Sequence, residues 1–362
     1  KKLNKSEFEF ISGYSKVKLM FYRNDIFRIW LAQDGEYTNP AGNAIVVDYG
    51  KKNPSVSVSE NSRYYRFSTP ACVVRVYKKP LRFALYDKAD KKMIFEEKEP
   101  LSFGAKTYQT LKRGGKEYFY GGGMQQGRFS HGGTDLDISI TGWHEDQVSN
   151  PVPFYMSSNG YGVFRNTFAP GKYSFSGVGQ VAAEDGMKIE YSSTLSHNEN
   201  RFDAFYFYGP TLKDILNDYT DITGKPFMPA LWMLTMGDAD CYNKPEQRVG
   251  WKQQTPDVIT QIADKYIEHD MPRGWILPND GYGCGYVKLD SVVRELKKRG
   301  FYTGLWTENG VDKIAYEVGE CGTRLCKLDV AWVGPGYEFA LNGTKAAYEG
   351  IENNSNERGF VW

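Results

Sequence analysis

Two side chains that could take part in catalysis, Lys327 and Asp329, stand two residues apart in a run of otherwise apolar residues. Alternate residues of a strand share a face, so both are predicted to lie opposite the apolar residues between and beside them. A lysine on the same face favours the ionised form of the aspartate, and an ionised carboxylate is what nucleophilic attack requires. The spacing is equally compatible with a salt bridge that only stabilises the fold.

Further acidic and aromatic side chains stand where other apolar runs of the second half end. Carboxylates accept hydrogen bonds from sugar hydroxyls and indole rings stack on the apolar faces of sugars, so the combination suits a saccharide. An acidic residue at a strand end can instead cap a helix or be solvated in a loop. The candidate substrate-binding residues are Asp238, Asp280, Trp306, Glu308, Lys327 and Trp332.

Other catalytic chemistries find little support. The four histidines are scattered without HxH or HExxH spacing, and the five cysteines contain no CxxC pair, so no metal site is predicted. No GxSxG segment indicates a serine hydrolase. A dinucleotide-dependent oxidoreductase fits the alternation of strands and helices, but no G-x-G-x-x-G turn begins at Gly237. We therefore expect carboxylate chemistry without a cofactor.

The net charge and the hydropathy of the chain limit which classes of partner are expected. The formal net charge is +1, with both signs spread evenly, so neither nucleic acid nor an anionic membrane is expected as a partner. No run of about 18 apolar residues occurs and the first ten residues lack the apolar core of a signal peptide, which predicts a soluble, already processed chain. A periplasmic or extracellular location is favoured over a cytoplasmic one, and a homo-oligomer stays open.

The periodicity of the chain changes near residue 210. Residues 1–209 are short alternating runs punctuated by Gly, Asn, Asp and Pro, which predicts an N-terminal antiparallel β-sandwich. Residues 210–228 contain a predicted helix with Thr211 as its N-cap, and form the junction. Residues 229–362 alternate strands and helices, which implies parallel strands with right-handed crossovers.

The last part is predicted to be the first half of a barrel. The predicted strands are 231–236, 274–277, 302–307, 325–330 and 360–362, and Thr255 is predicted to cap the first helix. An open doubly wound sheet also fits, but polar residues at the strand ends favour a (β/α)8 barrel, whose active sites lie at that end. Because such a barrel has eight strands, only about half of one is expected here, as part of a longer protein.

Short motifs along nearly the whole chain match one enzyme family. Residues 153–163 read P-F-Y-M-S-S-N-G-Y-G-V, and residues 208–226 contain Y-G-P-T and T-G-K-P. H-D-M-P at 269–272 precedes the second predicted strand, K-L-D ends at Asp329, and R-G-F-V begins at Arg358. In these segments the chain resembles glycoside hydrolase family 31, the retaining α-glycosidases.

The resemblance implies roles for individual residues. Asp329 would be the nucleophile, forming a covalent glycosyl-enzyme that water hydrolyses with retention of configuration. Arg358 joins the candidate substrate-binding residues. The general acid of the family follows the sixth strand, so it is expected beyond Trp362 and no residue of this chain is assigned that role.

Two departures from the family pattern bear on the substrate. Where α-glucosidases of the family have W-L-D-I-D-Y, residues 276–282 read I-L-P-N-D-G-Y, so Pro278 replaces the acid that binds an equatorial O4. The sequence D-V-A-W-V-G from Asp329, in place of D-M-N-E, resembles the branch of bacterial α-galactosidases. The resemblance thus favours an α-galactosidase, with α-glucoside hydrolysis or transglucosylation second and a non-catalytic carbohydrate-binding protein third.

Overall fold

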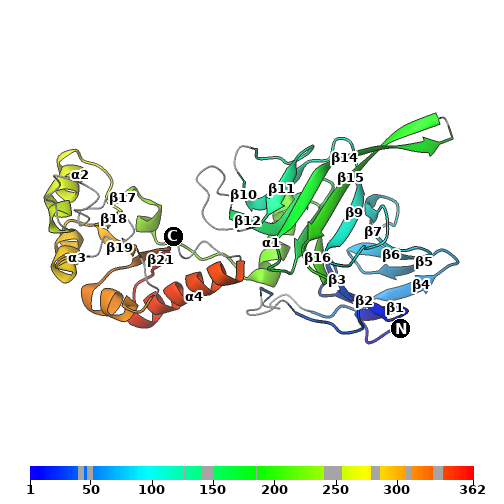
Figure 1. The fold of residues 1–362 in the computed structure, drawn as a ribbon, viewed down its shortest axis with the longest axis horizontal. Helices are drawn as coiled ribbons and strands as arrows, with labels where there is room; N and C mark the ends of the chain where they lie inside the picture. The colour runs from blue at the N-terminus through cyan, green and yellow to red at the C-terminus, as the bar shows by residue number, and fades with distance from the viewer. Residues whose placement is uncertain are drawn as a thin grey trace. The chain divides into compact units, whose positions relative to one another are not determined.

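The computed structural model describes residues 1–39, 45–46, 52–125, 128–139, 150–184, 186–239, 255–278, 286–306, 311–328 and 337–362. These residues form two compact units, of which the first ends at Pro226 and the second begins at Phe227 (Figure 1). The described strands of the first unit pair antiparallel, and those of the second pair parallel.

The described strands of the first unit form two antiparallel sheets. The smaller sheet contains, in spatial order, β1 (Glu7–Ser12), β2 (Ser15–Phe21), β3 (Ile26–Ala32), β16 (Phe202–Tyr208), β13 (Tyr161–Arg165), β12 (Asn150–Ser157) and β10 (Phe119–Met124). The larger sheet contains β11 (Asp135–Ile138), β14 (Gly171–Ala183), β15 (Gly186–His197), β9 (Thr107–Arg113), β8 (Met93–Glu97), β7 (Leu81–Asp87), β6 (Cys72–Lys78), β5 (Tyr64–Ser68) and β4 (Ser57–Glu60).

The core between these sheets is aromatic. Phe27 of β3 and Tyr206 of β16 are fully buried and stack with their ring centroids 4.9 Å apart. Phe95 of β8 lies 5.4 Å from Tyr206, so this contact crosses from the larger sheet to the smaller one. Period-two alternation therefore gives each sheet one apolar face, and the two faces pack together. The predicted β-sandwich is confirmed.

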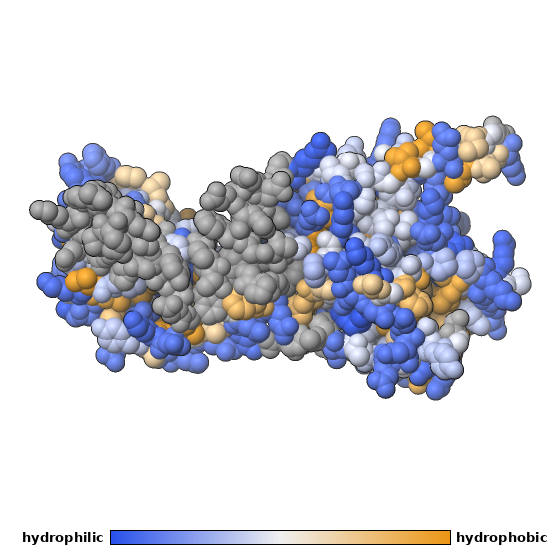
Figure 2. Space-filling model, in the orientation of Figure 1, coloured by the Kyte–Doolittle hydropathy of each residue, from blue (hydrophilic) through white to orange (hydrophobic). Residues whose placement is uncertain are grey.

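The hairpin of β14 and β15 projects beyond the rest of the larger sheet (Figure 1). Near its end, Val178, Met187 and Ile189 are 65%, 66% and 54% exposed, and Figure 2 shows apolar residues gathered there. The sandwich core therefore does not cover this stretch of the hairpin.

The helix α1 (Leu212–Thr223) follows the sandwich and packs on its smaller sheet. Thr211 caps it as predicted, since its hydroxyl accepts a hydrogen bond from the Asp214 amide while the Asp214 carboxylate accepts one from the Thr211 amide. The Tyr219 ring of the helix stacks on Phe154 of β12 at 3.9 Å. Gly224 ends the helix with φ at +103°, a conformation that favours glycine.

The second unit contains a parallel sheet whose described strands follow one another in chain order. They are β17 (Gly237–Ala239), β18 (Trp275–Leu277), β19 (Tyr302–Trp306), β20 (Leu325–Lys327) and β21 (Phe360–Val361). Within the described ranges, the helical segments of this unit are two 3₁₀ turns (Leu231–Leu234 and Thr255–Asp257), two π-helical stretches (Ile259–Ala263 and Ala315–Cys321), α2 (Asp264–Glu268), α3 (Leu289–Lys298) and α4 (Tyr337–Asn354).

One local prediction in this unit is wrong. The run 231–236 begins as a 3₁₀ turn rather than a strand, and the first strand starts only at Gly237. Leu231 and Leu234 are 82% and 74% exposed, so an apolar run without alternation was a poor guide to a buried strand. Thr255 stands at the start of the helical segment, in a 3₁₀ turn, and its hydroxyl accepts a hydrogen bond from the Val287 amide.

Candidate active site

The second sheet has one face covered by helices. Ile276 of β18 packs in a cluster with helical Val292 and Leu296, and Cys326 of β20 packs in another with Val318 and Ile351. Alternate residues of these strands therefore point to the opposite face, here called the inner face. The inner face carries Gly237, Trp275, Leu277, Tyr302, Gly304, Trp306, Leu325 and Lys327.

Leu277 and Leu325 fill the middle of the inner face. Both are buried, and they lie over Gly304 of the strand between them. A Cβ atom at Gly304 would be 2.6 Å from Leu325 Cδ2 and 2.8 Å from Leu277 Cδ1. Because residue 304 has no side chain, the two leucines can lie over it and fill the layer of inner-face side chains beneath the strand ends.

Lys327 and Trp306 lie together at the carboxyl ends of β20 and β19. The two residues are partners in the parallel register, and the Lys327 Nζ lies 4.2 Å from the centroid of the Trp306 ring. The ring of Trp362, which follows β21, lies 5.5 Å from the same Nζ. A cation over indole rings at these distances is attracted by their π electrons. The predicted opposition of Lys327 and the apolar Cys326 is confirmed by the burial of Cys326 against the helices.

Trp362 is a component of this face that the sequence reasoning missed as a site residue. Its ring lies 5.3 Å from that of Trp275, across the inner face. Trp275 in turn covers Gly237, where a Cβ atom would be 2.1 Å from Trp275 Cε2. Val361 faces the helices, so its neighbours Phe360 and Trp362 are expected on the inner face. This alternation could have predicted Trp362 as a site residue.

Tyr286 holds the carboxyl end of β19 and was also missed. Its hydroxyl accepts a hydrogen bond of 2.7 Å from the Trp306 amide and donates one of 3.3 Å to the Trp306 carbonyl. The orientation of the Trp306 main chain is thereby fixed by a side chain 20 residues away in the sequence. No local sequence motif predicts such a long-range contact.

Asp238, a predicted substrate-binding residue, lies on the helix-covered side. It is the register partner of Ile276, whose side chain packs among the helices, and register partners of parallel strands share a face. The Asp238 carboxylate accepts a hydrogen bond of 3.2 Å from the Tyr266 hydroxyl of α2. Burial, and then the nearby Asp238 charge, raise the pKa of Tyr266, which keeps the hydroxyl protonated as the donor. The structure therefore does not bring Asp238 together with Trp306 and Lys327.

Arg358, also a predicted substrate-binding residue, stands before β21 and hence at the amino-terminal edge of the sheet. Its Nη1 donates a hydrogen bond of 2.6 Å to the Met228 carbonyl, and its guanidinium lies 5.8 Å from the Phe227 ring. Arg358 therefore binds the segment that leads into the second unit, away from the strand ends that carry Lys327 and Trp306.

The remaining predicted residues lie outside the described ranges. They are the nucleophile candidate Asp329 and the substrate-binding candidates Asp280, Glu308 and Trp332. Among the described neighbours of these residues, Pro278 is buried directly after β18, and Leu328 packs toward the helices directly after β20.

The described part of the site offers aromatic surface and one ammonium group. Indole rings can stack on a neutral sugar, and a cation beside a strand end favours an ionised carboxylate near it. Within the described ranges, no three His, Cys, Asp or Glu residues are grouped to hold a metal ion. Over the same ranges, no helix combines the length and the apolar character that crossing a membrane requires.

Comparison with known proteins identifies the first unit. Residues 16–173 match the family model of the glycosyl hydrolase 31 N-terminal galactose mutarotase-like domain. Alpha-glucosidase 2 of Bacillus thermoamyloliquefaciens is 26% identical over 339 residues, which cover 88% of this chain and 41% of the relative. An alpha-xylosidase of Emericella nidulans is 33% identical over 228 residues, covering 56% of this chain and 26% of that protein.

Solved structures show the same fold. A GH31 dextranase of Flavobacterium johnsoniae in complex with glucose superposes with a TM-score of 0.78 at 17% identity, covering 98% of this chain and 53% of the dextranase. A GH31 alpha-xylosidase from a soil metagenome gives a TM-score of 0.76 at 16% identity, covering 99% of this chain and 64% of that chain. The chain thus spans between 26% and 64% of the length of these proteins, and the match of residues 16–173 places that part of the chain in glycoside hydrolase family 31.

Proposed function

We propose that the chain carries the nucleophile of a retaining exo-acting α-glycosidase. The observation that carries the proposal is the position of Lys327 on the inner face, beside Trp306 at the carboxyl edge of a parallel sheet. If the strand alternation continued past the helix-facing Leu328, the sequence pattern would predict the same face for residue 329. Asp329 is therefore assigned as the nucleophile, with Lys327 favouring its charged form.

The second unit is proposed to be the first part of a (β/α)8 barrel. Its described strands are parallel, and each is hydrogen-bonded to the next in chain order. This is the order that a closed barrel requires, and catalytic residues of such barrels sit at the carboxyl ends of strands. The fold likeness to the dextranase and the xylosidase supports this assignment.

The proposed reaction has two displacements. The Asp329 carboxylate attacks the anomeric carbon, and the bond to the leaving oxygen breaks as a general acid donates a proton to that oxygen. Water, deprotonated by the same acid–base group, then releases the sugar with retained configuration. The resemblance to the family assigns that group to sequence beyond Trp362, at about 5 to 5.5 Å from the nucleophile.

The substrate class is proposed to be α-glucosides and α-linked gluco-oligosaccharides. The relatives reported above are an alpha-glucosidase, an alpha-xylosidase and a dextranase, which favours this class over the α-galactosides that the sequence motifs put first. α-Galactosides remain the second candidate because of Pro278. It is buried at the end of β18 and has no carboxylate to accept a hydrogen bond from an equatorial O4.

The full-length protein tests both candidates. Nitrophenyl α-glucoside, α-galactoside and α-xyloside are compared as substrates of the wild type and of Asp329→Asn. We expect turnover of the glucoside, and Asp329→Asn should lower it by at least about a thousandfold, the usual scale for loss of a catalytic nucleophile. Mass spectrometry with a 2-deoxy-2-fluoro glycosyl fluoride should place the covalent label on Asp329.

Three results would contradict the proposal in different ways. A label on another residue would remove the nucleophile assignment. Preferential turnover of the galactoside would make α-galactosides, rather than α-glucosides, the first substrate candidate. Sugar binding without hydrolysis of any of the three substrates would favour the non-catalytic carbohydrate-binding protein.

A further inference from the structure

The core-facing side of the larger sheet continues along the hairpin of β14 and β15 beyond the part that is buried. On β15, Leu195 is fully buried, and Tyr191, Ile189 and Met187 follow on the same face because alternate residues of a strand share a face. Tyr191 is partly buried, whereas Ile189 and Met187 are 54% and 66% exposed. The apolar side chains of this face therefore extend further than the core that covers them.

The strand β14 adds to the same face. Register partners of antiparallel strands share a face, so Val178 lies beside Tyr191, and Ala182 lies beside Met187. A β-bulge earlier in β14 inserts one residue and shifts the alternation of the strand, which brings the 65% exposed Val178 to this side. The surface formed by Val178, Ala182, Met187, Ile189 and Tyr191 is here called the ribbon face.

Neighbouring strands give the ribbon face little support. Among the described strands, β11 pairs with β14 over residues 171–174, and β9 pairs with β15 over residues 191–197. An isolated two-stranded hairpin is marginally stable at best in water, and exposed apolar patches commonly mark interaction sites. The ribbon face is therefore a surface that another molecule is expected to cover.

The two ends of the ribbon face carry opposite charges. Glu184 is exposed in the turn at the tip. At the base, Arg113 of β9 is the register partner of Tyr191, and its guanidinium lies 5.0 Å from the centroid of the Tyr191 ring. The guanidinium donates hydrogen bonds to the Ser192 and Gly114 carbonyls, and no described carboxylate forms a salt bridge with it. A surface with an acidic tip, an apolar middle and a basic base is complementary to the same surface turned end to end.

We infer that the ribbon face is the interface between two copies of this chain, related by a two-fold axis at the level of Lys188. A two-fold axis brings the same surface of both copies together in opposite directions. Met187 of each copy then packs on Ile189 of the other. Counted along β15, Glu184 lies four residues from the axis toward the tip, and Arg113 lies three residues from it toward the base. Each glutamate therefore comes within one residue, ~3.3 Å, of the level of the other copy's arginine.

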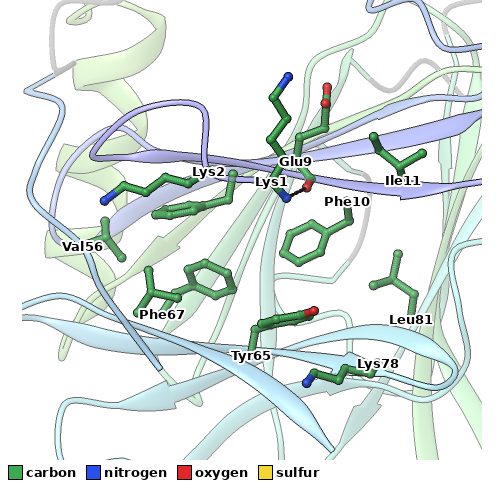
Figure 3. Close-up of a pocket in the computed structure, with 12 residues that line it drawn as sticks. Lys1, Lys2, Glu9, Phe10, Ile11, Val56, Tyr65, Phe67, Lys78 and Leu81 are labelled. Carbon is green, nitrogen blue, oxygen red and sulfur yellow. Dashed lines mark hydrogen bonds between the residues drawn. The ribbon is translucent and has the colours of Figure 1, made fainter. Parts of the chain in front are cut away.

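A second apolar opening of the first unit lacks this complementarity. A cleft of about 760 Å³ between β1 and the larger sheet is lined by the rings of Phe10 and Tyr65 (Figure 3). Lys1, Lys2 and Lys78 line the same cleft. Two copies that met there would bring ammonium groups together, and like charges across an interface are unfavourable. The ribbon face is therefore better suited than the cleft to bind a second copy.

The ribbon face is small for an interface. The hairpin has seven paired positions beyond the bulge, so the face is ~23 Å long and ~10 Å wide. Two such faces bury less than the ~1,200 Å² at which stable interfaces begin. We therefore expect a weak dimer, with a dissociation constant in the micromolar range.

Sedimentation velocity of the full-length protein tests the inference at concentrations up to ~100 μM. The sedimentation coefficient of the wild type should rise with concentration toward that of a dimer. Ile189→Asp should sediment as a monomer throughout, because it places two carboxylates without partners near the axis. Ile11→Asp is the matched control and should dimerise as the wild type does, since Ile11 is a 60% exposed isoleucine of the same unit that lines the cleft instead.

An exchange of charges tests the end-to-end arrangement. Glu184→Arg and Arg113→Glu should each weaken dimerisation by about fivefold, since each variant brings like charges together twice. The double variant restores opposite charges and should dimerise within about twofold of the wild type. Melting temperatures identify a variant that does not fold, and Glu184→Arg changes only an exposed turn.

Four results would overturn the inference. They are a wild type that stays monomeric at every concentration, an Ile189→Asp protein that dimerises as the wild type does, loss of the dimer in Ile11→Asp, and a double variant no tighter than the single ones. Ile189→Asp should hydrolyse nitrophenyl α-glucoside at the wild-type rate, because the ribbon face is distant in sequence from the catalytic candidates. The dimer and the proposed function can therefore fail independently.

Discussion

The hydroxyl of Tyr286 makes two hydrogen bonds with the main chain of Trp306, accepting one from its amide and donating one to its carbonyl. Trp306 is the last residue of β19 and the register partner of Lys327. In our proposal Tyr286 contacts neither the substrate nor the nucleophile. It nevertheless sets the orientation of Trp306, which would contact the substrate.

Tyr286→Phe should lower kcat/KM by about three- to tenfold, because loss of a net hydrogen bond is worth ~1 kcal/mol and Trp306 would turn more freely. Steady-state kinetics of the full-length protein on its best nitrophenyl glycoside measure this. Tyr348→Phe, at a 38% exposed tyrosine of α4, serves as the control. Equal kinetics of the two variants would show that Tyr286 does not position the site.

Gly237→Ala should lower the melting temperature of the second unit. The added Cβ atom would stand 2.1 Å from Trp275 Cε2, so the ring must move, at a cost of ~1 to 3 kcal/mol. Gly319→Ala is the control, since its Cβ atom would find nothing closer than 3.7 Å. If thermal unfolding of both variants follows the wild type, the packing of Trp275 over Gly237 is not tight in solution.

Lys327→Met should shift the acid limb of the kcat/KM profile to higher pH, because the ammonium that favours an ionised nucleophile is removed. Lys327→Arg keeps the charge and should restore most of the acid limb. Rates are measured from pH 4 to pH 8 on the nitrophenyl substrate. A uniform loss of rate with an unmoved profile in Lys327→Met would indicate a packing role for the Trp306–Lys327 contact alone.

Glu97 should make the stability of the first unit depend on pH. The side chain is fully buried on β8, accepts hydrogen bonds from the Phe83 amide and the Gln109 side-chain amide, and burial raises its pKa from 4.5 to about 7. Between these two values the folded state holds a proton that the unfolded state has lost. Stability contributed by this proton is therefore present below pH 4.5 and is lost as the pH rises through 7.

Urea unfolding at pH 5 and at pH 8 checks this expectation. The wild type should lose of order 1 to 3 kcal/mol between the two values because of Glu97, and Glu97→Gln should lose less. Glu99→Gln, at an exposed glutamate close in sequence, should behave as the wild type. An identical pH slope in Glu97→Gln would show that another group titrates.

Local alternation determined much of what was predicted correctly. The period-two runs of residues 1–209 predicted a β-sandwich, and the Thr211 cap marked the start of α1 because both signals depend on neighbouring residues. The sequence also predicted, for the same reason, that Lys327 and Cys326 lie on opposite faces of their strand. A buried apolar side chain on one face of a strand leaves the polar neighbour on the other.

Tertiary packing decided the rest. Placing the first strand at 231–236 put Asp238 beyond its end, whereas the strand is Gly237–Ala239 and Asp238 lies within it, facing Tyr266. The long-range contacts of Tyr286 with Trp306 and of Trp362 with Trp275 join residues that no local period connects. The sequence by itself fixes which side chains alternate along each strand. Only the packed helices decide which of the two faces is covered, because the burial of apolar area is a property of the assembled layers.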